Sequence, residues 1–145
     1  MRFVLFDRVL EFEAGRRIVG VKCISAAEDA FQGPFARRAA YPAALVLEAM
    51  VQLLAWTAIA QHDFTVSVVL GGVDDVELPA DLPPGTSLRI TGALQGTHAR
   101  GSVGRVHAEV DGQVVARVGR ALYGHVAGVD PDVMRSRFAW FGGPV

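Results

Sequence analysis

The sequence predicts a single α+β domain in which a curved antiparallel sheet wraps one long apolar helix. Residues 43–60 are almost wholly apolar, which is typical of a helix surrounded by protein on all sides. The segments on either side carry the apolar runs and turn residues that are typical of strands. A length of 145 residues, 51% of them hydrophobic and 20% charged, suits one folded domain with its own core.

Two strands and a loop are predicted before the helix. Residues 2–13 and 18–25 are rich in Phe, Val, Leu and Ile, and an Ala-Gly turn separates them. Residues 26–41 have no clear period and contain glycine and proline, so we expect a loop. Pro42 follows at the first turn of the helix, where proline is tolerated because its missing N–H has no partner there.

Four strands are predicted after the helix, where the apolar period changes to two. We place them over residues 66–73, 86–95, 101–110 and 113–123. Asp111 and Gly112 join the last two, and this pair favours a type I′ turn because both positions need positive φ. Since one helix must be covered by these strands, we expect the sheet to curl around it.

The last twenty residues predict a short additional helix. Asp130 before Pro131 has the form of an N-cap followed by proline at the first helical position. We expect Trp140 and Phe141 to pack on the domain or on a partner subunit. The side chains that this helix is expected to carry toward the body are Val133, Met134, Phe138 and Phe141.

Charge and cysteine content exclude several classes of function. The formal net charge is −1, which is poorly suited to broad electrostatic binding of nucleic acid or anionic lipid. The single cysteine forms no internal disulfide. Charged residues interrupt the early apolar stretch, so we expect no signal peptide. Glu48 within the apolar helix is costly in lipid, which favours a core helix over a membrane span. We therefore expect a cytoplasmic protein with no nucleic-acid or membrane partner.

Several segments together carry a resemblance to a known family. They are DRVLE at 7–11, GRRIV at 15–19, FQG at 31–33, LEAM at 47–50 with Gln52, and VVLGGVD at 68–74. This combination resembles the (3R)-hydroxyacyl-acyl-carrier-protein dehydratases, which are hot-dog fold proteins of type II fatty acid synthesis. The resemblance covers residues 3–123, and we expect one hot-dog domain over 1–145, with a dehydratase-like core at 1–124 and an extension at 125–145.

The chain departs from this family just before the helix. The family reads Gly-His-Phe-Pro-Gly-x-Pro-x-Met-Pro-Gly, whereas this chain reads GPFARRAAYPA at residues 33–43. Pro34 therefore stands at the position of the catalytic histidine, Tyr41 at that of the methionine and Ala43 at that of the last glycine. The carboxylate on the helix is kept as Glu48.

The resemblance implies a role for each of these positions. In the family, the histidine is the base, the helix carboxylate from the other subunit of a dimer handles the hydroxyl, and a backbone N–H at the helix start holds the carbonyl. Pro34 has no ionisable side chain and no N–H, so it can fill none of these roles. The candidate catalytic positions are Glu48, Tyr41 and the substituted Pro34.

Four further residues are candidates for binding the substrate. These are Phe35, Arg38, Ala43 and Gln52. Gln52 lies one helical turn after Glu48 and is placed to hydrogen-bond it. Arg38 with Arg37 is either a guide for an acidic carrier protein or part of a solvated loop. Glu48 itself either lines an acyl-thioester site or is a buried carboxylate that fixes packing. We expect no cofactor and no metal.

Three functions remain open. The first is a dehydratase-like protein that binds acyl thioesters on acyl-carrier protein or coenzyme A, is not catalytic alone, and is a homodimer or pairs with an active homologue. The second is an active dehydratase, isomerase or thioesterase that uses Glu48 with Tyr41 or water. The third is an assembly or regulatory protein that keeps only the fold. Whether the chain is an enzyme is left open.

The four histidines, His62, His98, His107 and His125, are expected to lie at the surface and not to act as the catalytic base.

Overall fold

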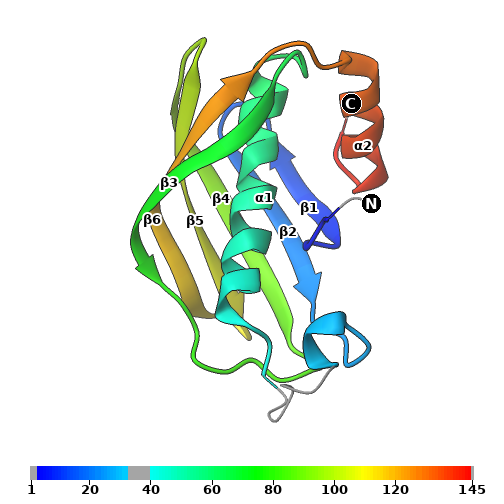
Figure 1. The fold of residues 1–145 in the computed structure, drawn as a ribbon, viewed down its shortest axis with the longest axis vertical. Helices are drawn as coiled ribbons and strands as arrows, with labels where there is room; N and C mark the ends of the chain where they lie inside the picture. The colour runs from blue at the N-terminus through cyan, green and yellow to red at the C-terminus, as the bar shows by residue number, and fades with distance from the viewer. Residues whose placement is uncertain (1–2, 33–39, 145) are drawn as a thin grey trace.

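A six-stranded antiparallel sheet curls around a central helix in the computed structural model, which describes residues 3–32 and 40–144 (Figure 1). The strands are β1 (Arg8–Glu13), β2 (Arg17–Cys23), β3 (Ser67–Glu77), β4 (Ser87–Thr97), β5 (Gly101–Val110) and β6 (Gln113–Val126). The helices are α1 (Ala43–Gln61), α2 (Pro131–Trp140) and the short 3-10 helix η1 (Asp29–Phe31). This architecture is the α+β hot-dog fold that the sequence predicts.

The strand order places β1 and β3 at the two edges of the sheet. The order is β1-β2-β4-β5-β6-β3, and every neighbouring pair is antiparallel. Asp111 and Gly112 connect β5 to β6 with φ values of 50° and 80°, so the predicted turn is confirmed.

Helix α1 lies against the sheet because glycines let its side chains approach the strand backbone. A Cβ atom at Gly20 would lie 2.8 Å from Leu53, and one at Gly104 would lie 3.0 Å from Leu54. By length and composition α1 could cross a membrane, but 61% of its most apolar window is buried inside the domain. The helix is therefore the core of the fold, as predicted.

The chain after β6 covers the β1 edge and ends against the core. Asp130 caps α2 by accepting a hydrogen bond from the Asp132 N–H at 2.9 Å, which confirms the predicted N-cap. Phe138 is fully buried and stacks on Trp56 with ring centroids 5.3 Å apart. Beyond the helix, the Phe141 carbonyl accepts a hydrogen bond from the Val9 N–H of β1 at 2.7 Å.

The prediction for the tail is only partly correct. Met134 and Phe138 are buried, and Phe141 packs on Phe6 with ring centroids 4.9 Å apart. Val133 is 43% exposed and Trp140 is 85% exposed, so neither packs on the body of this chain. The reason is that α2 docks through one narrow face, on which Met134 and Phe138 lie one turn apart.

Several strand boundaries also differ from the prediction. Residues 3–7 are not a strand, and β1 begins only at Arg8. Strand β3 continues to Glu77 instead of ending at residue 73. Its added residues lack apolar alternation, but cross-strand ion pairs hold them, including Asp75 with Arg117 at 2.7 Å.

Candidate functional site

Glu48 and Gln52 form a hydrogen-bonded pair on α1. The Gln52 side-chain amide donates from Nε2 to Oε1 of Glu48 at 2.9 Å, across one helical turn. Both side chains are partly exposed, whereas Ala49, Met50 and Leu53 around them are fully buried. The structure thus contains the contact that the sequence predicts and presents the carboxylate at the surface of the core helix.

The same amide holds the first residues of the chain, which we call the N-terminal strap (residues 3–7). The Leu5 N–H donates to Oε1 of Gln52 at 2.9 Å, and Nε2 of Gln52 donates to the Phe3 carbonyl at 2.9 Å. Gln52 therefore fixes the strap across α1 and orients Glu48 at the same time. The sequence gives no sign of the strap contact, because 47 residues separate Leu5 from Gln52.

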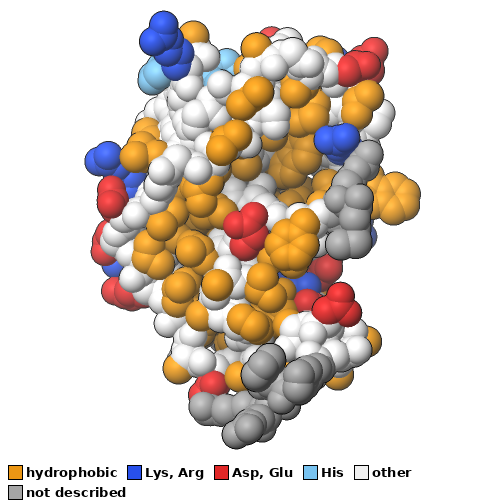
Figure 2. Space-filling model, in the orientation of Figure 1, with side chains coloured by type: hydrophobic (Ala, Val, Ile, Leu, Met, Phe, Trp, Pro, Cys, Tyr) orange, Lys and Arg blue, Asp and Glu red, His pale blue; other side chains and the backbone are white. Residues whose placement is uncertain are grey.

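An apolar groove opens beside Gln52, between the strap, the C-terminal half of α1, the start of β3, and α2. Its volume is about 330 Å³. Hydrophobic side chains gather over this face of the molecule, around α1 and β3 (Figure 2). The groove is lined by Phe3, Val4, Phe6, Gln52, Ala55, Trp56, Ile59, Ser67, Val68, Met134, Arg137 and Phe141. No acidic side chain is among the described residues that line it, so it suits an apolar chain.

Tyr41 is buried among groups of η1 and β2. Its ring is 2% exposed, lies 6.0 Å from the Phe31 ring and has the Lys22 ammonium 5.6 Å from its centroid. Burial and then the negative charge of Glu28 raise the pKa of Tyr41 above its usual value. Within residues 3–32 and 40–144, the hydroxyl has no partner of hydrogen-bond geometry, although Glu28 lies near it. The phenol is therefore neutral at physiological pH.

Lys22 and Glu28 form a mostly buried ion pair that the sequence analysis missed. Their Nζ and Oε1 atoms are 2.8 Å apart, and the Ser25 N–H also donates to Glu28 at 3.1 Å. Burial opposes ionisation of Glu28, but the hydrogen bonds from Lys22 and Ser25 outweigh it and lower the pKa. Strand alternation was the available signal, because Lys22 shares the inward face of β2 with Ile18 and Gly20.

The first turn of α1 is the remaining described part of the predicted site. Ala43 is its first residue, and Pro42 occupies the N-cap position without a side-chain cap hydrogen bond. The first amide groups of a helix have no acceptor within the helix and carry a partial positive charge. Predicted site residues Pro34, Phe35 and Arg38, together with Arg37, lie outside the described residues.

Three of the four histidines, His62, His98 and His125, cluster at the C-terminal end of α1, where the His62 and His125 ring centroids are 4.5 Å apart. His62 contacts Thr97 at 2.6 Å, Thr97 contacts Ser102 at 2.7 Å, and Ser102 contacts His125 at 2.7 Å. This chain of polar groups is not visible in the sequence, because its members come from α1 and three different strand ends. His62 follows Glu48 by fourteen residues, which is about 21 Å along the helix axis.

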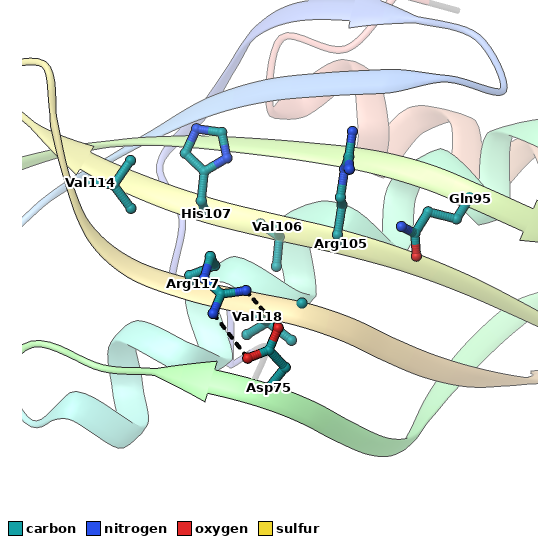
Figure 3. Close-up of a pocket in the computed structure, with 9 residues that line it drawn as sticks. Asp75, Gln95, Arg105, Val106, His107, Val114, Arg117 and Val118 are labelled. Atoms are coloured by element: carbon teal, nitrogen blue, oxygen red, sulfur yellow. Dashed lines mark hydrogen bonds and ion pairs between the residues drawn. The ribbon is translucent and has the colours of Figure 1, made fainter.

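The fourth histidine lies on the outer face of the sheet, beside a cavity of about 520 Å³ (Figure 3). Arg105 and His107 point away from the core there, since Val106 between them is buried. The Arg117 guanidinium binds Asp75 through two hydrogen bonds of 2.7 and 2.9 Å and lowers the pKa of that carboxyl. This cavity is separated from Glu48 by the sheet and adds no group to that site.

Comparison with known proteins agrees with this fold. A family model described as a FabA-like domain matches residues 1–119. The chain is 36% identical over 118 residues to a 3-hydroxyacyl-[acyl-carrier-protein] dehydratase FabZ of Herpetosiphon aurantiacus, covering 81% of this chain and 84% of that protein. It is also 36% identical over 116 residues to the FabZ of Bacillus cytotoxicus, covering 78% and 79% of the two chains.

A solved structure agrees at the level of the fold. The smu.793 protein of Streptococcus mutans, described as bound to acetyl CoA, superposes with a TM-score of 0.69 at 12% identity, covering 90% of this chain and 96% of that one. The chain belongs to the FabA-like family of hot-dog proteins, and within it the curated relatives are FabZ-type dehydratases. Helix α2 lies beyond the residues that the family model matches.

Proposed function

We propose that this protein binds acyl thioesters as a FabZ-like hot-dog protein and does not dehydrate them on its own. The observation that carries the proposal is the Glu48–Gln52 pair beside an apolar groove, with the histidines at the far end of α1 or on the outer sheet face. The curated relatives are named as dehydratases of 3-hydroxyacyl chains on acyl-carrier protein, so we infer the same class of ligand.

The chemistry explains why a binding role is favoured over catalysis. Elimination of water from a 3-hydroxyacyl thioester needs a base for the C2 proton and an acid for the leaving hydroxyl. In our proposal Pro34 stands where the family's base would be, and it cannot accept a proton. Tyr41 does not replace it, because a buried phenol with a raised pKa stays protonated. An active enzyme, which is the alternative, would have to use Glu48 with water.

The retained groups suit a bound thioester. We propose that Glu48 lies beside the 3-hydroxyl group and that Gln52 positions it, since the Gln52 amide is already engaged with Glu48 and the strap. The N–H of Ala43 at the start of α1 would face the thioester carbonyl, where the helix dipole favours negative charge. Phe35 and Arg38 remain proposed contacts for the thioester and its acidic carrier.

A second subunit is the proposed partner. The β1 edge is already covered, because the Val9 N–H donates to the Phe141 carbonyl at 2.7 Å. Strand β3 forms the other edge, and Val69 on it is 59% exposed, with Leu70 and Val76 also exposed. An open edge with apolar side chains favours pairing with a second chain. We propose a cytoplasmic homodimer, or a heterodimer in which this chain lends Glu48 to an active homologue.

Calorimetric titration with 3-hydroxydecanoyl-pantetheine tests the binding proposal. We expect saturable binding with a negative heat-capacity change, which is the mark of apolar burial. Ala55→Trp fills the groove and should abolish binding, whereas Val114→Trp on the outer sheet face is the matched control and should not. Absence of binding by the unmodified protein, or equal effects of the two variants, would contradict the proposal.

A further inference from the structure

The groove beside Gln52 contains an arginine that has no counter-ion among the residues that the structure describes. Arg137 lines it from α2, and its Nε atom is buried without a hydrogen-bond partner within the described residues. Arg137 forms no ion pair within residues 3–32 and 40–144, whereas Arg135 on the same helix contacts Asp132 at 3.5 Å and donates to the Asp63 carbonyl at 3.1 Å. A buried donor without an acceptor is rare and costly in a native protein.

Helix α2 is also the part of the groove that the family model does not match. Residues 1–119 match the model, and Met134, Arg137 and Phe141 come from beyond them. These three side chains form one wall of the groove, and this wall is apolar except for the Arg137 guanidinium. A feature built by an added helix is suited to select among ligands rather than to supply a general property of the fold.

From these contacts we propose that the groove takes an acyl chain whose far end carries a carboxylate, which pairs with Arg137. The inference rests on the proposed function, since it assumes that the thioester end of the ligand lies on the Glu48 side of the groove. Carboxylate is the matching chemistry because guanidinium N–H groups bind both of its oxygens, while the rest of the groove is apolar. A plain alkyl chain would offer the Arg137 guanidinium no acceptor, because the other side chains that line the groove supply no anion.

The spacing along α1 sets the length of the chain. Trp56 meets α2 through its stack on Phe138, and it follows Glu48 by eight residues. Eight residues of α-helix rise about 12 Å, which corresponds to an extended acyl chain of roughly ten carbons. The expected ligand is therefore the half-thioester of a dicarboxylic acid of about this length, and decanoyl and sebacoyl pantetheine are matched probes that differ only in the terminal group.

Tryptophan fluorescence gives a direct measurement of this preference. The chain has two tryptophans; Trp56 lines the groove, and Trp140 is exposed outside it. In the Trp140→Phe protein, Trp56 reports binding alone. We expect sebacoyl-pantetheine to bind about 10- to 100-fold more tightly than decanoyl-pantetheine, as a charge-assisted contact predicts.

Variants of α2 separate the charge of Arg137 from its packing. Arg137→Met should reduce the two probes to similar affinity, and Arg137→Lys should keep part of the preference. Arg135→Met is the matched control and should keep all of it, because Arg135 packs over Phe64 and does not line the groove. If decanoyl-pantetheine binds as tightly as the sebacoyl probe, or Arg137→Met keeps the preference, the inference is wrong while the proposed function stands. If neither probe binds, the proposed function fails and the inference with it.

Discussion

Removal of the Phe138 side chain tests whether α2 is an integral wall of the domain. Phe138 is fully buried and touches three aromatic rings from different elements. Its ring lies 5.0 Å from that of Phe12 on β1, 5.3 Å from that of Trp56 on α1 and 5.7 Å from that of Phe64 after α1. Phe138→Ala would therefore leave a cavity where these elements meet.

The expected cost is large for a domain of this size. A buried Phe→Ala change lowers the free energy of unfolding by about 3–5 kcal/mol, through lost burial and the cavity that remains. The three ring contacts place Phe138 toward the upper part of that range. Trp140→Ala, two residues away on the same helix, removes a larger ring that is 85% exposed and should change stability by less than about 0.5 kcal/mol.

Urea unfolding followed by circular dichroism measures both variants under the same conditions. The midpoint of Phe138→Ala should fall well below that of the unmodified protein with a similar slope, and that of Trp140→Ala should not move. A loss below about 1 kcal/mol for Phe138→Ala, or equal losses for the two variants, would show that α2 does not dock as described. The groove wall that contains Arg137 would then be in doubt as well.

Three further predictions concern other parts of the molecule. Gln52→Ala should speed amide hydrogen exchange in the N-terminal strap and cost about 0.5–1.5 kcal/mol, because Leu5 and Phe3 lose hydrogen bonds that are partly exposed to water. Burial and then the charge of His125 lower the pKa of His62 in the folded protein. The contribution of His62 to the free energy of unfolding is therefore full above the unfolded pKa of about 6.5, and it is lost as the pH falls below that value. His62→Asn should flatten that part of the stability–pH curve, and an unchanged curve would refute the assignment. Asp130→Ala should cost about 1 kcal/mol in urea unfolding through loss of the α2 cap, and no loss would contradict the capping contact.

The elements predicted best are those whose signals are local. The composition of residues 43–60 predicts α1, and the Asp111–Gly112 pair predicts the β5–β6 turn, because each depends on its own residues. The end of β3 was missed because Asp75 and its neighbours give no strand pattern by themselves. They form a strand through ion pairs with β6, which no local window contains.

The candidate site was predictable only along α1. The Glu48–Gln52 contact follows from helical spacing, and the structure contains it. The strap over Gln52, the Lys22–Glu28 pair beside Tyr41 and the wall formed by α2 depend on long-range packing. Tyr41 illustrates the difference, since its position just before the helix in the sequence does not indicate that its hydroxyl is buried near Glu28.

The most direct test is the turnover of 3-hydroxydecanoyl-pantetheine by the purified protein, with formation of the enoyl product followed at a protein concentration that saturates binding. If the protein binds the thioester but has no catalytic base, the thioester should stay bound and no enoyl product should form above the uncatalysed rate. This result is expected for the unmodified protein and for Glu48→Gln. Product formation at an ordinary enzymatic rate of about 1–1,000 per second, lost in Glu48→Gln, would contradict this prediction and show that the chain is an active dehydratase.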